Sequence, residues 1–346
     1  MSLSAPSPAP PARTVSVTVF VVALLVVAGV AIAVTAAYYE IRPAPALAGS
    51  VSITDDVGRQ VAVPVDPARV VELAPNIMDS LDRLGLRSHV VGVDCGTPAD
   101  GGLATDYNAS QIALWNLSAS MCVETSPSLD IPQVLNFSPQ LVLASTITSV
   151  SDVEELSSTY GIPVVILAPS TLGGILVDVT LLGEIFNVPQ AADRLVAQLQ
   201  GSLGTAAATV ANDTSAGGPL PSVLLTYYAD AAAGPSPGYW TYGPNSFGQS
   251  LIEFVGGASI AASSPFPYVL LSGDQVLNAS PSIIIYGTGF GVTLSTYQQG
   301  PDWSDLSAVQ SDHIYGIDSN YLTEADPTMI LVTVPLMVSI LYPASG

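Results

Sequence analysis

The chain has 346 residues, and 49% of them are hydrophobic, so it can form two domains with well-packed cores. Its formal net charge is -21, from 28 acidic residues against seven arginines and no lysine. A surface with this charge repels nucleic acid, which excludes nucleic-acid binding, and the hydrophobic content excludes a disordered chain.

The N-terminal region contains a stretch that is long and apolar enough to cross a bilayer. Residues 14–39 carry no charge, and residues 15–37 are nearly all Val, Ala, Leu and Ile. Arg13 precedes the stretch, which favours a cytoplasmic N-terminus and a body outside the cell. A cleavable signal peptide with Ala46-Leu47-Ala48 as its cleavage site is the alternative. We expect a cytoplasmic leader at 1–13, a transmembrane anchor at 14–39 and a tether at 40–50, in a single-pass protein of the cell membrane.

Residues 51–170 show short strands that alternate with helical segments. A hairpin is expected over 51–54 and 60–63, followed by strands at 69–74, 89–93, 140–144 and 163–167 and helices after Pro75-Asn76, at 131–137 and at 150–160. This alternation predicts a mainly parallel sheet with helices on both faces. Ligands on such sheets collect at the carboxyl ends of the strands, here in the loops at 75–76, from Asp94 onward, at 145–148 and at 168–171.

A long helix is predicted in the middle of the chain, between two blocks of this kind. Apolar residues recur at helical spacing over 189–210, namely Ala192, Leu195, Val196, Leu199, Leu203, Ala206, Ala207 and Val210. The predicted fold class is α/β, with two lobes of mainly parallel sheets joined by one long helix, plus an N-terminal transmembrane helix. We expect a first lobe at 51–170, linking helices at 171–216 and a second lobe at 217–346, with the functional cleft between the lobes.

The cysteines and sequons fit an oxidising, extracellular compartment. Cys95 and Cys122 lie in a loop-rich part of the first lobe, where a disulfide is expected and two free buried thiols are the alternative. Only two histidines exist, one in each lobe, so we expect no metal site in the protein itself. The sequons most favoured for glycosylation are at Asn108, Asn116 and Asn212.

An ordered set of short motifs over residues 51–344 resembles the substrate-binding proteins of ABC importers for iron-siderophores and cobalamin (vitamin B12). In the first lobe these are Asp55-Asp56-Val57-Gly58-Arg59, Ala74-Pro75-Asn76, Ser138-Pro139-Gln140-Leu141-Val142-Leu143 and Tyr160-Gly161-Ile162-Pro163-Val164-Val165. In the second lobe they are Leu251-Ile252-Glu253-Phe254-Val255-Gly256-Gly257 and Asp274-Gln275-Val276-Leu277-Asn278-Ala279-Ser280-Pro281. The resemblance implies a bilobal binding protein that closes modestly around its ligand and delivers it to a permease.

The resemblance also implies residues for permease docking and for ligand binding. The family docks through one acidic residue on each lobe. In the second lobe that residue corresponds to Asp274, whereas the first-lobe position is Pro132, with Asp130 as a nearby substitute. Cleft aromatics of the family correspond in the second lobe to Tyr227 or Tyr228, to Trp240 and to Tyr268, and Tyr242 is added as a further stacking residue. On the facing lobe we select Asn76, Asp94 and Tyr107. The alternative is that some of these aromatic residues cover the core of the lobe.

The ligand and the class of function follow from charge and from missing motifs. The chain has no Lys or Arg after Arg194, so the second lobe offers no permanent positive charge to an anionic ligand. We expect a ligand of little negative charge, a corrinoid in preference to a ferric hydroxamate, with no cofactor besides a ligand that is itself a cobalt or iron complex. An enzyme is not expected, because no nucleophile–base or metal motif is present. The alternative function is a surface or envelope interaction protein built on the same fold without a role in transport.

Overall fold

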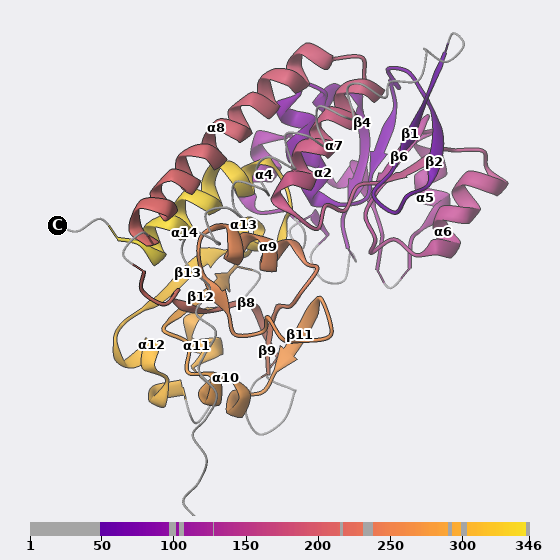
Figure 1. The fold of residues 1–346 in the computed structure, drawn as a ribbon. Coiled ribbons are helices and arrows are strands. Elements are labelled where there is room, and N and C mark those ends of the chain that lie inside the picture. The colour runs from indigo at the N-terminus through magenta and orange to yellow at the C-terminus, as the bar shows by residue number, and fades with distance from the viewer. Residues whose placement is uncertain are drawn as a thin grey trace, which may run out of the picture.

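The chain folds into two α/β lobes joined by a long helix (Figure 1). This computed structural model describes residues 49–96, 102–103, 107–126, 128–214, 217–230, 238–289, 293–298 and 303–343. The predicted leader, anchor and tether lie outside these residues, apart from the last two residues of the tether. Within the described ranges, no helix combines the length and hydrophobicity needed to cross a membrane.

Five parallel strands form the sheet of the first lobe, as predicted. In spatial order they are β5 (Cys122–Val123), β4 (Val90–Asp94), β3 (Val70–Glu72), β6 (Leu141–Ala144) and β7 (Val164–Ile166). Alternate residues face two different core clusters: Val70 and Leu141 face one, Val71 and Val142 the other. Because both faces are buried, the strands carry almost only apolar residues.

Helices and one hairpin complete the first lobe. The hairpin is β1 (Ser50–Thr54) and β2 (Gln60–Pro64), which pair antiparallel as expected. The helices are α2 (Pro75–Arg83), α4 (Ala109–Leu114), α5 (Ile131–Asn136), α6 (Val150–Glu154) and α7 (Leu172–Ile185), with 3-10 turns η1 (Arg87–His89) and η3 (Ala119–Met121) and a π-helical segment η4 (Glu155–Thr159). The expected helix over 150–160 is therefore α6 continued by a π segment.

The second lobe has a mixed sheet in the order β11-β9-β8-β12-β13, with β10 beside β8. Strands β8 (Ser222–Asp230), β10 (Ala258–Ser259), β12 (Ile283–Thr288) and β13 (Ile314–Asp318) are parallel. Strands β9 (Gly238–Tyr242) and β11 (Tyr268–Leu271) run antiparallel at one edge. The helices of this lobe are α9 (Phe247–Phe254), α10 (Gly273–Ala279), α11 (Leu294–Tyr297), α12 (Ser307–Gln310), α13 (Ser319–Thr323) and α14 (Val334–Leu341), with η5 (Trp303–Asp305) and η6 (Met329–Thr333).

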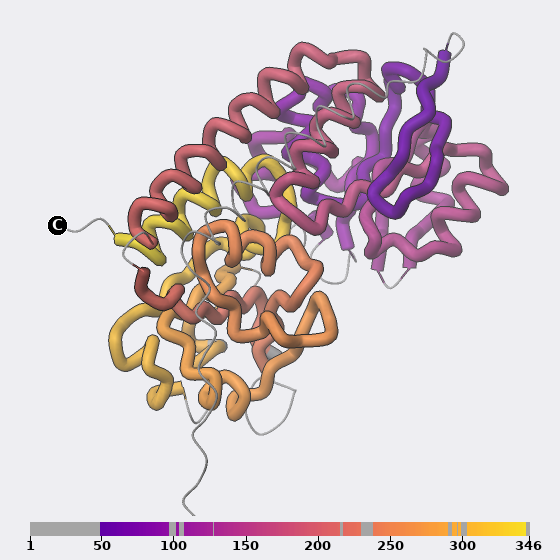
Figure 2. The backbone as a smooth tube through the Cα atoms, viewed as in Figure 1, coloured from indigo at the N-terminus to yellow at the C-terminus, as the bar shows by residue number. Residues whose placement is uncertain are grey.

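The linking helix α8 (Pro189–Thr214) buries the predicted apolar stripe. Ala192, Leu195, Leu199, Ala206 and Val210 are buried in a core cluster that includes residues of both lobes. The C-terminal segment, yellow in Figure 2, runs back along this helix, and α14 packs against it. The two lobes therefore share one continuous apolar core along α8.

Helices α7 and α8 approach each other closely because two small residues meet between them. A Cβ atom placed on Gly183 would lie 2.4 Å from the Cβ of Ala192. This distance is shorter than carbon atoms tolerate, so a larger residue at either position would force the helices apart. The pair fixes how the linking helix leaves the first lobe.

The predicted disulfide is confirmed. Cys95 and Cys122 are bonded, with their Cα atoms 5.3 Å apart, at the carboxyl end of β4 and the start of β5. Strand β5 has only two residues, so ladder hydrogen bonds alone hold it weakly. The covalent bond thus attaches the edge strand of the first-lobe sheet to its neighbour.

Replacing Cys122 with serine should lower the free energy of unfolding by about 3–4 kcal/mol, because the bridge closes a loop with a sequence separation of 27. Denaturant unfolding of the oxidised wild type, the reduced wild type and Cys122→Ser measures this loss. Reduced wild type should match the variant. Two thiols that react with a label in the unfolded, unreduced protein would show that the bond is absent in solution.

Candidate functional site

Aromatic residues gather on one face of the second-lobe sheet, at its antiparallel edge. Tyr228 pairs with Trp240, Trp240 pairs with Leu270, and Tyr242 pairs with Tyr268 across β8, β9 and β11. Paired residues point to the same side, as do residues two apart along a strand, so all five share one face. Tyr228 and Tyr268 are 47% and 49% exposed, so much of their apolar surface is open to solvent. We call these five residues, with Tyr227, the aromatic face.

Tyr227 joins this face because of a bulge in β8. The β8–β9 register shifts between Thr226 and Tyr228, which allows two consecutive side chains to turn toward the same side. The Tyr227 ring lies 4.7 Å, between centroids, from the ring of Tyr242. The structure thus places together all five aromatic residues that the sequence selected in this lobe.

Tyr242 is the fixed centre of the aromatic face and not an open surface. It is 1% exposed, and its hydroxyl donates a hydrogen bond of 2.9 Å to the carbonyl oxygen of Leu322 in α13. Gly248 of α9 lies against the ring, where a Cβ would come within 2.1 Å of it. Burial raises the pKa of Tyr242 well above its usual value, so the hydroxyl stays a neutral donor. The alternative of a residue that covers the core therefore applies to Tyr242.

The first-lobe candidate Tyr107 is buried, with 0% exposure. Its hydroxyl donates to Oε2 of Glu72 at 2.9 Å, and its ring makes an edge contact with Trp115. The backbone amide of Ala74 donates to the other carboxyl oxygen of Glu72. Tyr107 is thus part of the first-lobe core, where it holds the side chain of Glu72 at the end of strand β3. It does not line an open cleft.

Glu72 is a residue that the sequence reasoning missed. It is fully buried at the carboxyl end of β3. Burial raises its pKa well above the usual range, and the negative charge of Asp94 and that of Glu324 from the second lobe add to the shift. The available signal was a charged residue inside the apolar run 69–74, which is rare in a central strand unless the residue has a specific partner.

Asp94 lies at the carboxyl end of the neighbouring strand β4. Its Oδ1 accepts hydrogen bonds from the Thr125 hydroxyl at 2.6 Å and from the Gly96 amide at 2.9 Å. Burial raises the pKa of Asp94, and these hydrogen bonds oppose that rise. The first-lobe strand ends β3 and β4 therefore carry carboxyl groups and no cation.

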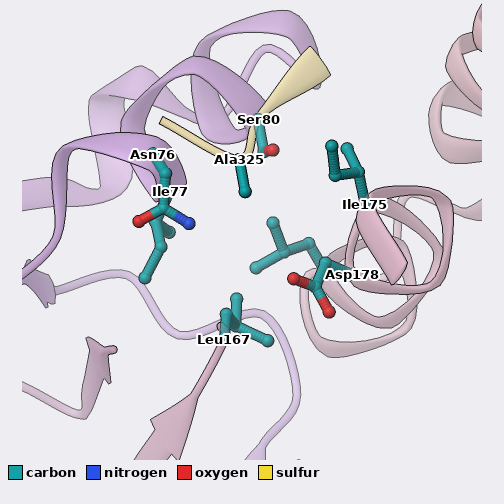
Figure 3. Close-up of a pocket in the computed structure, with 8 residues that line it drawn as sticks. Asn76, Ile77, Ser80, Leu167, Ile175, Asp178 and Ala325 are labelled. Atoms are coloured by element: carbon teal, nitrogen blue, oxygen red, sulfur yellow. The ribbon is translucent and has the colours of Figure 1, made fainter. Parts of the chain in front are cut away.

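Asn76 lies in the first turn of α2 and lines a small pocket together with Ser80, Asp178 and Ala325. Figure 3 shows its amide and the Asp178 carboxyl on opposite sides of that pocket. The pocket has room for roughly one water molecule, so it is too small for a corrinoid or a siderophore.

Side chains also connect the two lobes directly. Asn320 of α13 donates a 3.0 Å hydrogen bond to Gln111 of α4. Arg83 of α2 donates to the Thr328 hydroxyl at 2.7 Å, and Thr328 donates its amide hydrogen to Asp79. Helix α13 also accepts the hydrogen bond of Tyr242, so the aromatic face contacts a helix that reaches the boundary between the lobes.

The arginines of the described first lobe are engaged in structural contacts. Arg59 pairs with Asp55, Arg83 pairs with Asp79, Arg69 donates to the carbonyl oxygen of Phe137, and Arg87 donates to that of Trp115. Asp55 and Asp79 are themselves buried, so Arg59 and Arg83 neutralise carboxylates that would be costly to bury alone. None of the four lies at a carboxyl end of the parallel strands.

The two acidic residues proposed for permease docking differ in the contacts that their carboxylates make. Asp274 is exposed in the first turn of α10. Asp130 is the N-cap of α5, where its carboxylate accepts a 3.0 Å hydrogen bond from the Gln133 amide. Asp274 therefore presents its whole carboxylate to a partner, whereas Asp130 uses one oxygen to hold its own helix.

The three favoured sequons differ in local structure. Asn108 caps α4 through a capping box with Gln111, whereas Asn116 and Asn212 are exposed, the former with a φ of 50°. Glycan attachment at all three stays a prediction.

Comparison with known proteins agrees with the fold. A sequence profile described as periplasmic binding protein matches residues 70–321. A cobalamin-binding protein of Halobacterium salinarum is 28% identical over 328 residues, covering 89% of this chain and 81% of the relative. The uncharacterized ABC transporter substrate-binding lipoprotein YvrC of Bacillus subtilis is 23% identical over 286 residues, covering 81% and 82%.

Solved structures share the bilobal fold. The periplasmic vitamin B12 binding protein BtuF of Vibrio cholerae superimposes with a TM-score of 0.62 at 20% identity, over 80% of this chain and 98% of its own. A protein of an ABC-type Fe3+-hydroxamate transport system from Saccharomonospora viridis gives 0.65 at 18% identity, over 85% and 99%. The likeness at these identities concerns the fold.

Replacing Glu72 with glutamine should make the stability of the protein less dependent on pH. The raised pKa of Glu72 means that the folded state holds this proton more tightly than the unfolded chain, so wild type loses stability as pH rises above the usual value of 4.5. Glutamine resembles the protonated form and does not titrate. Urea unfolding from about pH 4.5 to about pH 8 should show Glu72→Gln gaining stability relative to wild type as pH rises. A constant difference across that range would contradict this account.

Proposed function

Because the chain belongs to the periplasmic binding protein family, we propose that it is a membrane-anchored extracellular substrate-binding protein that captures a corrinoid and delivers it to an ABC permease. The ligand binds between the lobes, against the aromatic face, with a ferric hydroxamate as the second choice. Support for a corrinoid comes from the cobalamin-binding relative and from the chemistry of the aromatic face.

The single observation that carries the proposal is the aromatic face itself. Tyr228, Trp240 and Tyr268 are partly exposed on one face of the sheet, and the rings of Tyr227 and Tyr268 both contact that of the buried Tyr242. An exposed apolar surface of this kind beside a lobe boundary is typical of a ligand-binding site. Flat, largely apolar ligands with many hydrogen-bonding groups at their rim fit such a face.

The lack of cationic side chains at the proposed site favours some ligands of this family over others. No residue of the aromatic face is cationic, the second lobe has no Lys or Arg, and the described first-lobe arginines are bound to other groups. A ferric catecholate carries several negative charges and needs charge-assisted donors when it is partly desolvated. The ends of strands β3 and β4 carry the carboxyl groups of Glu72 and Asp94 and supply no such donor. A neutral or cationic ligand does not need one.

Delivery to a permease is the second part of the proposed function. Asp274 supports it, because the residue is exposed at the start of a helix on the second lobe. Asp130 supplies the first-lobe contact in this proposal, although its capping role restricts it. A surface interaction protein on the same fold is the alternative function, and it would retain no corrinoid.

Replacing Trp240 with alanine should weaken cobalamin binding by at least about tenfold, which corresponds to roughly 1.4 kcal/mol, because a stacking surface at the centre of the face is lost. Equilibrium dialysis of the full-length chain in mild detergent measures this. Tyr160→Ala removes an aromatic residue that is 46% exposed on the first lobe and serves as the matched control. Wild-type protein that fails to bind either cobalamin or a ferric hydroxamate would leave the interaction-protein alternative.

Arg59→Ala and Arg83→Ala should bind cobalamin within about twofold of wild type, because neither guanidinium reaches the proposed ligand. Both variants lose an ion pair to a buried aspartate, so they should unfold at lower denaturant concentration, and binding is measured where they remain folded. Tight binding of a ferric catecholate that disappears in either variant would contradict the charge argument.

The proposed anchor predicts the N-terminus of the mature protein. Protein extracted from membranes should retain residues 15–37, because the apolar core is longer than that of a signal peptide and any small-residue cleavage site lies well beyond it. N-terminal sequencing tests this. A mature start near Gly49 would show that the segment is cleaved and that another means of attachment, or none, is used.

A further inference from the structure

The turn of the β1–β2 hairpin covers one edge of the first-lobe sheet, where β7 is the last strand. The backbone amide of Asp56 donates a 3.1 Å hydrogen bond to the carbonyl oxygen of Ile166, and the Asp55 carboxylate accepts one of 3.2 Å from the Ile166 amide. The guanidinium of Arg59 donates to the carbonyl oxygen of Val164 at 3.0 Å. These bonds occupy backbone groups that an edge strand otherwise leaves unpaired.

The side chain of Asp56 extends this contact beyond the end of β7. Its Oδ2 accepts a 2.6 Å hydrogen bond from the backbone amide of Ala168, and its carboxyl group forms a hydrogen bond with the carboxyl group of Asp178. Asp178 lies on α7, the helix that precedes the linking helix. Asp56 therefore connects three elements of the first lobe, namely the hairpin, the end of β7 and α7.

A hydrogen bond between two carboxyl groups requires a proton, because ionised carboxylates are acceptors only. The surroundings of Asp178 favour its protonated form. The residue is 5% exposed, and its Oδ1 has no hydrogen-bond partner among the described residues. Burial raises the pKa of Asp178 well above its usual value, and the charge of Asp56 adds to the rise. Asp56 itself is partly exposed, so the pair can exchange a proton with solvent.

The groups around the pair offer no positive charge to replace that proton. The charge of Asp55 acts on Asp56 and opposes its ionisation. Arg59 in the same turn pairs with Asp55 at 2.6 Å, and the other residues of α2, α7 and neighbouring segments that line the pocket beside Asp178 are neutral. Loss of the proton therefore leaves two negative charges at hydrogen-bond distance, where they repel each other.

We propose that Asp56 and Asp178 form a pH-sensitive contact, which holds the hairpin turn against the end of β7 and against α7 while the pair shares a proton and releases the turn when that proton is lost. In the released state both carboxyl groups are in water and ionise near their usual pKa of 3.8. The contact is therefore fully stabilised below that pH and weakens as pH rises through the raised pKa of the pair. It does not depend on the proposed corrinoid function.

Hydrogen exchange of the Ala168 amide tests the proposal, because this amide donates to Asp56 and exchanges when the contact opens. It is measured by NMR on the full-length protein in mild detergent from about pH 5 to about pH 8, corrected for the intrinsic exchange rate at each pH. Protection in wild type should fall with rising pH by up to about tenfold per pH unit, the slope for release of one proton. In Asp178→Asn the new amide donates to Asp56 without a titrating proton, so protection should stay within about twofold. Constant protection in wild type would overturn the proposal.

Two further variants identify the group that titrates. Asp178→Leu has a similar size and removes the bond entirely, so protection of the Ala168 amide should be low at every pH. Glu72→Gln removes another buried carboxyl group of the same lobe and should keep the wild-type dependence on pH. High protection in Asp178→Leu would show that the pair does not hold the turn. A fall with pH that persists in Asp178→Asn, or that disappears in Glu72→Gln, would assign the effect to another group and refute the proposal.

Discussion

The apolar stripe of α8 packs into a core that continues from one lobe into the other, and the rest of the structure depends on this shared core. Leu199 and Val210 are buried in the same cluster as first-lobe and second-lobe residues, and α14 returns along the helix to close it. Because the lobes are not independent bodies on a flexible linker, the boundary between them has a defined geometry. That geometry lets α13 connect Tyr242 of the aromatic face, through Leu322, with Gln111 of the first lobe, through Asn320.

The shortage of cationic side chains is a second constraint on the structure. The chain has seven arginines for 28 acidic residues, and those of the described first lobe neutralise buried aspartates or bond to backbone carbonyl oxygens. Few cations remain for a ligand, so recognition must rely on ring surfaces and neutral hydrogen bonds. The same shortage leaves the buried carboxyl groups of Glu72 and Asp178 without an arginine or lysine. Burial raises the pKa of both groups, and each forms a hydrogen bond with another side chain, Glu72 with Tyr107 and Asp178 with Asp56.

The helices and strands could be predicted from the sequence because burial requires apolar residues at regular spacing along each of them. The stripe of α8 and the first-lobe strands were located within a few residues, and the spacing of motifs led to the family. The aromatic face was predicted as a set of residues but not as a surface, because β9 and β11 join it by antiparallel pairing and a bulge that local sequence does not specify. Tyr107 was placed in the cleft, whereas a buried glutamate on a distant strand holds it in the core; such long-range partners leave no local signal.

The central claim is that the site binds a flat ligand of little negative charge through rings and not through cations. The most direct measurement compares the affinity of the full-length protein for cobalamin with its affinity for cobalamin derivatives in which one or more side-chain amides are hydrolysed to carboxylates. Shape is nearly constant in this series while negative charge increases. The account predicts that affinity falls with each added carboxylate and that the loss shrinks at high salt. Affinity that is unchanged or that rises with negative charge would contradict it.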